Sequence, residues 1–309
     1  MTKSSSAGVA RGATYVFVQG FIASFIGVAY IMVVTRVLSE TQRGIYAIFN
    51  LILSLVQIFG TFALSYAATN YIAKYVAEGT PEKAKSIASR VLEISVISSA
   101  SIFILLSILA EFLSSSLLSG QAEPSMIQVL ALASVLNILY MQVAAFVQGI
   151  QRILELAIVS ATYNLFQNAV GIYLLSIGFG LWGILCGWII GLTLSVLLGI
   201  VFTGKFLGFS RSFHPIRPLF KFSFPLYLSG ILSFFVSWID QILVLLLLSA
   251  SYGLAEAQRV LGYYYIAVRA SIVPSLLASS IVAALFPKLS ELHAQGGVAN
   301  LKEAFRAST

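Results

Sequence analysis

Eight long apolar runs decide what this chain can fold into. A helix needs about 20 consecutive apolar residues to cross the hydrocarbon core of a bilayer, and eight segments meet that requirement. Solid runs of this length predict helices, because the strands of a membrane barrel would show short alternating segments. The predicted spans cover approximately residues 13–35, 44–68, 91–113, 126–147, 156–177, 181–203, 222–248 and 262–286.

The composition indicates the same class of protein. Hydrophobic residues make up 59% of the sequence and charged residues only 9%, whereas a soluble domain is about 25% charged. Such a chain cannot cover a water-facing surface, so we predict an all-α integral membrane protein. The first apolar run is too long for the core of a cleaved signal peptide, and we expect it to remain as the first span.

The basic residues between the spans predict the orientation of the chain. Fourteen of the 18 Lys and Arg residues fall in the N-terminal tail, in alternate loops and in the C-terminal tail. These segments lie on one side of the membrane, and basic residues favour the cytoplasmic side. We therefore expect a multi-pass protein of the plasma membrane with a cytoplasmic N-terminus. Topology and attraction to anionic membrane lipids account for the net charge of +7, so we expect no nucleic acid partner.

An internal repeat predicts two lobes. Residues 30–40 align with 240–250, and residues 44–54 align with 262–272, in hydropathy and in the positions of glycines and loops. Six spans separate the copies, so both have the same orientation, as in transporters that handle substrate between two halves. The second lobe would need about four further spans to match the first. The predicted divisions are an N-terminal tail, a six-helix lobe, an inter-lobe loop and the start of a second lobe with an amphipathic helix, at 1–12, 13–203, 204–221 and 222–309.

The only aspartate of the chain, Asp240, lies inside a predicted span. A charged side chain at the bilayer centre costs roughly 2.5–3.5 kcal/mol on the insertion scale. Arg269 lies at a matched depth in the next span, and sequential spans are antiparallel neighbours, so we expect a pair or a shared wet cavity. Two interpretations stay open. The pair either lines a cavity, where it binds phosphate or couples a cation or proton, or it is a structural bridge between the spans.

Other polar residues are candidates for the wall of a substrate cavity. Asn164, Gln167 and Asn168 share one helix face at spacings of three and four, where amides serve either sugar recognition or helix packing. Arg36, at the outer end of the first span, is either a contact for glycan or phosphate or a solvated anchor. The hinge candidates are the prolines inside two predicted spans, Pro225 and Pro274.

Small residues and turn signals predict local geometry at two places. Gly79 is expected to end one helix, with Thr80 as the N-cap of the next and Pro81 as its first residue. A stripe of small residues at four-residue spacing in the sixth span predicts close approach of another helix. The stripe consists of Gly183, Gly187, Gly191, Ser195 and Gly199.

Two blocks of the sequence resemble the polysaccharide-transporter branch of the multidrug/oligosaccharidyl-lipid/polysaccharide (MOP) exporter superfamily. Residues 35–75 have a "TR-L" end to the first span and "G-Y" at the start of the second. Residues 238–292 have "D-ILL", a loop, "GYY-A-R", a mid-helix proline and a terminal "LFP-LSEL". The resemblance implies a flippase in which two six-helix lobes enclose a cationic cavity. Such a protein moves a polyprenyl-pyrophosphate-linked glycan from the cytoplasmic to the outer leaflet by alternating access.

The resemblance has one clear departure. The related peptidoglycan-precursor flippase carries cavity arginines in spans 1, 2 and 8, and here only Arg269 has a comparable place, which argues against peptidoglycan precursor as the cargo. The alternative within the superfamily is a cation-coupled exporter of small molecules or drugs. Such exporters use intramembrane carboxylates, of which only Asp240 lies deep in this chain.

An enzyme is not expected. A single aspartate excludes an Asp-x-Asp metal motif, and no nucleotide-binding or nucleophile signature is present. Cys186, His214 and His293 are too few for a Cys/His metal site. We accordingly predict no catalytic residue, no bound metal and no cofactor.

The two interpretations of Asp240 and Arg269 make different predictions for charge reversal. A structural bridge predicts that Asp240→Asn and Arg269→Gln reduce transport and that the Asp240→Arg/Arg269→Asp swap restores it. A binding role predicts loss of transport in all three variants at normal expression. Transport of lipid-linked glycan in cells, with expression measured by immunoblot, separates the two.

Overall fold

The computed structural model describes residues 3–204 and 215–271, which form ten α-helices and no strand. The prediction of an all-α fold is confirmed. The chain divides into two units, Met1–Ile266 and Ala267–Thr309, and the contacts below lie within the first. The helices are α1 (Lys3–Val37), α2 (Glu40–Thr61), α3 (Leu64–Ala77), α4 (Pro81–Ile108), α5 (Ala110–Leu117), α6 (Pro124–Gly149), α7 (Ile153–Ser176), α8 (Gly180–Gly204), α9 (Ile216–Tyr252) and α10 (Leu254–Ala270).

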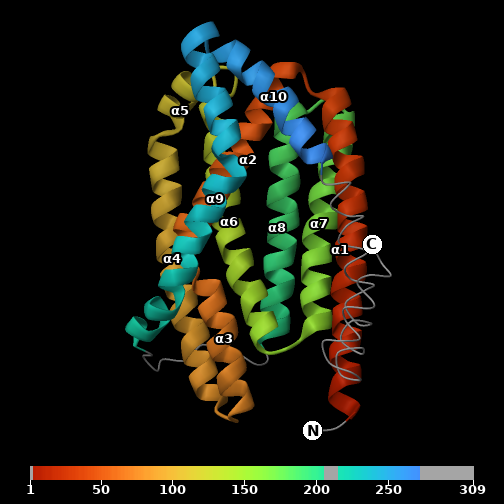
Figure 1. The fold of residues 1–309 in the computed structure, drawn as a ribbon, viewed down its shortest axis with the longest axis vertical. Helices are drawn as coiled ribbons and strands as arrows, with labels where there is room; N and C mark the ends of the chain where they lie inside the picture. Colours follow the sequence, from red (N-terminus) through yellow and green to blue (C-terminus); the bar gives the residue numbers. More distant parts are fainter. Residues whose placement is uncertain (1–2, 205–214, 272–309) are drawn as a thin grey trace, which may run out of the picture. The chain divides into compact units, whose positions relative to one another are not determined.

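Six of the described helices are long and apolar enough to cross a membrane, namely α1, α2, α4, α6, α8 and α9. The predicted span 156–177 forms α7, which runs beside α8 and α1 (Figure 1) although it is less apolar than these six. Its amides, among them Gln167, lower its hydropathy. Most of the predicted span 262–286 lies outside the described residues.

The two ends of the first unit carry different elements. Figure 1 shows the connection between α1 and α2, together with α5 and α10, at one end, here called the α1–α2 end. The opposite end, here called the α3 end, holds α3, the start of α4 and the connection between α6 and α7. Helix α9 crosses between the ends and packs against α2 and α3, so the first helix of the predicted second repeat contacts helices of the predicted first lobe.

The predicted span 44–68 is not one helix, which corrects the sequence analysis. Helix α2 ends at Thr61, and Phe62 and Ala63 adopt the left-handed conformation, with φ of 47° and 54°, before α3 begins at Leu64. Non-glycine residues seldom adopt this conformation, and each costs about 1–3 kcal/mol. Surrounding contacts therefore have to hold the break in place.

Neighbouring groups satisfy part of the backbone that the break exposes. The N–H of Phe62 donates to the carbonyl of Ile58 at 3.2 Å, which closes the last turn of α2. Ser98 on α4 donates its hydroxyl proton to the carbonyl of Gly60 at 2.7 Å. In hydrocarbon an unpaired carbonyl is costly, so the serine of α4 stabilises the interruption of α2.

The connection between α3 and α4 confirms the predicted turn. Gly79 has a φ of 69°, Thr80 is the N-cap of α4, and Pro81 is its first residue. Positive φ is easy for glycine and costly for other residues, which explains the choice at this position.

The second repeat begins with a longer helix than predicted. Helix α9 extends over 37 residues and passes through Pro225, one of the two hinge candidates. Gly253, at a φ of 86°, ends it, and α10 starts with the next residue. The loop expected between residues 248 and 262 is therefore mostly helical. Pro274, the other hinge candidate, lies outside the described residues.

The stripe of small residues on α8 brings α7 into backbone contact, as predicted. A Cβ at Gly187 would lie 2.6 Å from the carbonyl oxygen of Gln167, and one at Gly191 would lie 2.8 Å from its nitrogen. The buried hydroxyl of Ser195 donates to the carbonyl of Val159 at 3.1 Å, which adds an interhelical hydrogen bond. The contacts involve main-chain atoms that cannot rotate away, so this face of α8 tolerates no larger residue without a shift of α7.

We expect Gly187→Ala to destabilise the protein by about 1–3 kcal/mol, because the added methyl group collides with the backbone of α7. Gly27→Ala on α1 is the matched control, since a Cβ at Gly27 meets no atom within 4 Å. Thermal unfolding of the purified proteins in detergent measures the difference. Equal unfolding midpoints for the two variants would contradict the close packing of α7 and α8.

Candidate functional site

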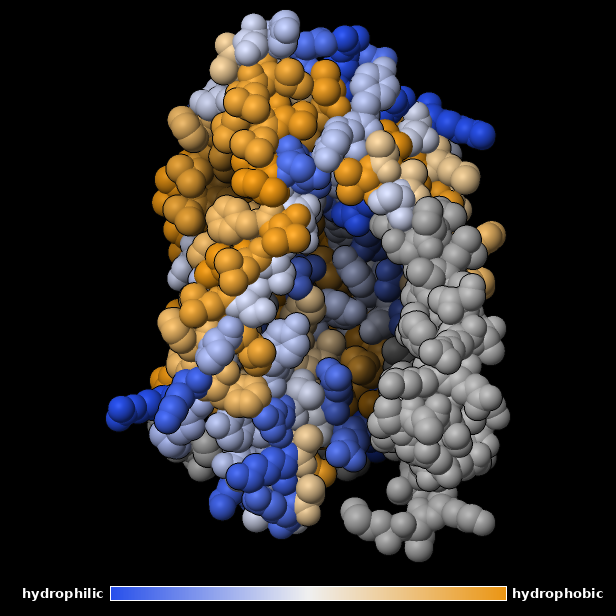
Figure 2. Space-filling view, viewed as in Figure 1, coloured by the Kyte–Doolittle hydropathy of each residue, from blue (hydrophilic) through white to orange (hydrophobic). Residues whose placement is uncertain are grey.

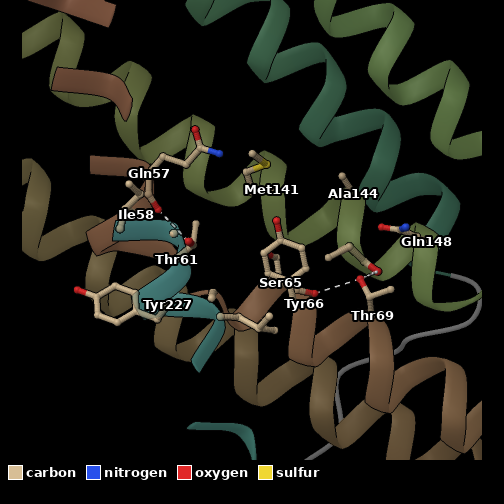
Figure 3. Close-up of a pocket in the computed structure, with 14 residues that line it drawn as sticks. Gln57, Ile58, Thr61, Ser65, Tyr66, Thr69, Met141, Ala144, Gln148 and Tyr227 are labelled. Atoms are coloured by element: carbon tan, nitrogen blue, oxygen red, sulfur yellow. Dashed lines mark hydrogen bonds between the residues drawn. The ribbon is translucent and has the colours of Figure 1, made fainter. Parts of the chain in front are cut away.

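A cavity of about 280 Å³ lies at the break between α2 and α3. Its walls come from α2, α3, α6 and α9 (Figure 3), so it lies between helices of the predicted first lobe and the first helix of the predicted second repeat. Gln148, one of its lining residues, belongs to the last turn of α6. Since α6 ends at the α3 end, the cavity lies toward that end. Interrupted helices often form the binding sites of membrane transporters, because irregular backbone is tolerated where it lines a cavity.

The wall of this cavity combines apolar side chains with several polar ones, and none of the described residues that line it is charged. Two threonine hydroxyls donate to main-chain carbonyls, Thr61 to Gln57 at 2.8 Å and Thr69 to Ser65 at 3.0 Å, so their oxygens can still accept. The amides of Gln57 and Gln148 form no hydrogen bond within the described part of the chain. The cavity therefore offers uncommitted donors and acceptors of neutral character.

Aromatic side chains complete the wall. Figure 3 shows the ring of Tyr66 between Gln57 and Thr61 on one side and Thr69 and Gln148 on the other. Tyr66 is 63% exposed. Tyr227, from α9, packs against Phe62 at a centroid distance of 5.8 Å, so the residue at the break also positions an aromatic ring of the predicted second repeat. Aromatic faces beside amides and hydroxyls suit a ligand with both apolar and hydrogen-bonding surfaces.

The surface of the molecule agrees with such a site. Figure 2 shows hydrophilic residues in a hollow on a face whose neighbouring surface is largely hydrophobic. Many large apolar side chains on the described helices are exposed, such as Val236 at 82% and Ile108 at 73%. Surface of this kind is expected to face lipid, which leaves the hydrophilic hollow as the water-accessible feature.

The carboxylate of Asp240 binds a tyrosine. The hydroxyl of Tyr264 on α10 donates to one carboxylate oxygen at 2.6 Å, and the backbone N–H of Gln241 donates to the other at 2.8 Å. Asp240 is half-buried on α9. The hydrogen bond from Tyr264 joins α9 to α10 across the turn at Gly253, and it gives the only aspartate of the chain a neutral partner.

The expected pair of Asp240 and Arg269 stays a prediction. Arg269 lies in the last turn of α10 and belongs to the second unit, so its position relative to Asp240 is outside what the structure describes. The sequence analysis missed Tyr264, whose only sequence signal is its place in the "GYYY" run at the start of the predicted eighth span.

The three amides of α7 do not line the cavity at the α2–α3 break. Asn164 donates to the carbonyl of Ser160 at 2.8 Å, and buried Asn168 donates to the carbonyl of Asn164 at 2.7 Å. Gln167 lies against the small-residue stripe of α8. Asn164 also borders a second cavity of about 470 Å³ between α1 and α7, which is almost entirely apolar. The two asparagines thus bond within α7, and a role of the three amides in sugar recognition stays a prediction.

Two arginines at the α1–α2 end have different surroundings. Arg36, predicted as a substrate contact or an anchor, is exposed in the last turn of α1. Arg43 donates to two carbonyls at the end of α1, from Nε to Leu38 at 3.0 Å and from Nη2 to Thr35 at 2.6 Å. Arg43, which belongs to α2, thus caps the C-terminal end of α1, where a positive charge also interacts favourably with the helix dipole.

Comparison with solved structures identifies the fold. A MOP superfamily transporter from Pyrococcus furiosus has a TM-score of 0.65 at 14% identity, covering 96% of this chain and 67% of that one. An outward-facing multidrug resistance MATE family transporter of the MOP superfamily matches with the same TM-score, identity and coverages. A MATE protein in the straight conformation has a TM-score of 0.63 at 16% identity, with coverages of 96% and 67%. A search of curated proteins finds no significant sequence match.

The class defined by these helices is an integral membrane protein with the fold of a MOP superfamily transporter. The sequence profile described as "Polysaccharide biosynthesis protein" matches residues 33–309. The match covers most of the chain, so the chain belongs to the polysaccharide biosynthesis protein family. The resemblance to the MOP exporter superfamily seen in the sequence is thereby supported.

We expect Tyr264→Phe to lower the thermal stability of the protein, because it removes the side-chain hydrogen bond of Asp240. Combined with Asp240→Asn, the loss should be smaller than the sum of the two single changes, since both remove the same contact. Tyr252→Phe, an exposed tyrosine near the end of α9, is the control and should unfold like the native chain. Strict additivity in the double variant would contradict the pairing.

Proposed function

We propose that this chain moves a polyprenyl-pyrophosphate-linked glycan from the cytoplasmic to the outer leaflet of the plasma membrane by alternating access between its lobes. Membership in the polysaccharide biosynthesis protein family and the transporter fold support the proposal. The observation that carries it is the uncharged cavity at the α2–α3 break. Amides, hydroxyls and exposed aromatic rings match the hydroxyl groups and apolar ring faces of neutral sugars.

The distribution of basic residues favours an α3 end that faces the cytoplasm. The described chain has Lys74, Lys83, Lys85 and Arg90 on α3 and the start of α4, at the end toward which the cavity lies (Figure 1). Under the positive-inside rule the N-terminus is then cytoplasmic, and the cavity opens toward the side where lipid-linked precursors are made. The same residues suit contact with anionic membrane lipids and with the pyrophosphate of the cargo.

The remaining predicted site residues have secondary roles in this proposal. Asp240, bound to Tyr264, is the candidate for a coupling cation or proton, with Arg269 as its proposed partner. Arg36 is the candidate for an exit contact at the α1–α2 end, and Pro225 for a bend in α9 during the cycle. Asn164, Gln167 and Asn168 remain candidates only if the cavity extends toward α7 in another conformation.

A cation-coupled exporter of small molecules or drugs is the second candidate. The solved structures of similar fold include a multidrug resistance MATE transporter. Aromatic faces such as that of Tyr66 can contact a cation, but none of the described residues that line the cavity at the α2–α3 break is a carboxylate that would neutralise it. The neutral wall favours a glycan over a cation. Loss of the gene should therefore stop lipid-linked glycan at the cytoplasmic leaflet without new sensitivity to dyes or drugs.

We expect Gln57→Leu and Gln148→Leu to slow transport of lipid-linked glycan by about two- to tenfold each, the effect of losing one neutral hydrogen bond to cargo. Gln128→Leu, the same change at an exposed position of α6, is the matched control. Transport is measured as glycosidase- or lectin-accessible glycan in vesicles at equal protein levels. Native rates in both cavity variants, together with new drug sensitivity in the deletion strain, would favour the exporter.

A further inference from the structure

Helices α2 and α10 cross with their backbones in contact at two glycines. A Cβ at Gly44 would collide with the carbonyl oxygen of Gln258, and a Cβ at Gly262 would lie 2.7 Å from the carbonyl oxygen of Glu40. Each glycine thus makes room for a peptide group of the other helix. Both contacts lie at the α1–α2 end (Figure 1), inside the first unit.

The crossing is reciprocal under the internal repeat. The alignment pairs Gly44 with Gly262, and extending this offset back to the first residue of α2 pairs Glu40 with Gln258, in place of the Ala250 of the preceding aligned block. The contact of Gly44 with Gln258 is therefore the repeat image of the contact of Gly262 with Glu40. Such exchange of partners defines an isologous contact, in which two copies present the same patch to one another. Equivalent surfaces of the two lobes meet here.

Few additional bonds hold the crossing, and they lie beside it. The carboxylate of Glu40 accepts a hydrogen bond from the hydroxyl of Tyr263 and forms an ion pair with Arg259 at 3.5 Å. Gln258 donates from Nε2 to the carbonyl of Leu117 at 2.9 Å, which ties α10 to the end of α5. Exposed ion pairs contribute little to stability, so the backbone contact at the glycines and the bond of buried Gln258 to α5 are the main constraints on the crossing.

Buried aromatic side chains extend the contact between α2 and α10 beyond the two glycines. The rings of Tyr46 on α2 and Tyr265 on α10 meet edge to face at 5.5 Å. Trp238 of α9 stacks on Tyr265 at 6.4 Å, and Trp188 of α8 lies 6.1 Å from Tyr46. All four side chains are at least 92% buried. In the described part of the chain these four packed rings therefore form an apolar layer next to the crossing.

The cavity at the α2–α3 break lies on the other side of this layer. Gln57 in its wall is about 20 Å from Gly44 along α2, at roughly 1.5 Å per residue. We infer that the Gly44–Gly262 crossing is the outer gate between the lobes, closed in this structure while the cavity lies toward the opposite end. Opening to the outer side requires α10 to leave α2 at this crossing. The assignment of the outer side rests on the proposed function.

A labelling experiment tests the gate without using any cargo. In a chain with Cys186→Ala, Tyr227→Cys places a reporter thiol in the wall of the cavity. We expect Gly44→Ala or Gly262→Ala to raise its reaction with a membrane-impermeant thiol reagent from the outer side by about tenfold, because the added methyl group opposes closure. Gly27→Ala, where a Cβ meets no atom within 4 Å, should leave the rate unchanged. Unchanged outer labelling in both glycine variants would overturn the inference.

Cross-linking tests the same gate with native glycines. Glu40→Cys and Tyr263→Cys, in the Cys186→Ala background, are joined by a short bifunctional thiol reagent, and the bridged protein should lose transport. The control pair Tyr140→Cys/Ser160→Cys joins α6 to α7 within the first lobe and should leave transport intact. Full transport with the gate bridged would overturn the inference. Altered labelling in a chain that moves no lipid-linked glycan would instead keep the gate and reject the proposed function.

Discussion

The structure depends on how backbone polar groups are satisfied where water is absent. A helix satisfies them internally, and any interruption has to find partners from neighbouring elements. The break at Phe62 and Ala63 meets this requirement through Ser98 of α4 and through a polar cavity that can hold water or cargo. One local departure from helical geometry therefore creates the polar wall, turns α3 away from α2 and brings Phe62 against Tyr227 of the other repeat.

Glycine contacts serve two different purposes in this chain. Along α8 the close approach involves two helices of one lobe, and interhelical bonds such as that of Ser195 to Val159 reinforce it. The contact of Gly44 with α10 joins α2 to the predicted second repeat, and beside it lie an exposed ion pair and one hydrogen bond from buried Gln258 to α5. We therefore expect the contact along α8 to persist, whereas opening the proposed gate at Gly44 requires only a few bonds to break.

The sequence predicts what depends on length and periodicity, and misses what depends on tertiary context. The apolar runs, the turn at Gly79 and the stripe on α8 were predictable because each has a local cause. The break after Thr61 was not, because no proline marks it and the bond from Ser98 that stabilises it comes from a distant segment. The helical start of α10 was missed because Glu256 and Arg259 make it polar, although it packs against α2.

The candidate site shows the same division. Amides were visible throughout the predicted spans, but nothing local separates Gln57, which lines the cavity, from Gln167, which packs against α8. Only the packing of α6 and α9 around the break makes that distinction. The described wall that results carries no charge, so the pyrophosphate of the proposed cargo would have to bind outside the cavity that holds the sugar. The basic residues of α3 and α4, such as Lys83, lie toward the same end as the cavity. In the proposed cargo, the neutral sugar would contact the cavity wall and the anionic pyrophosphate would contact these basic residues.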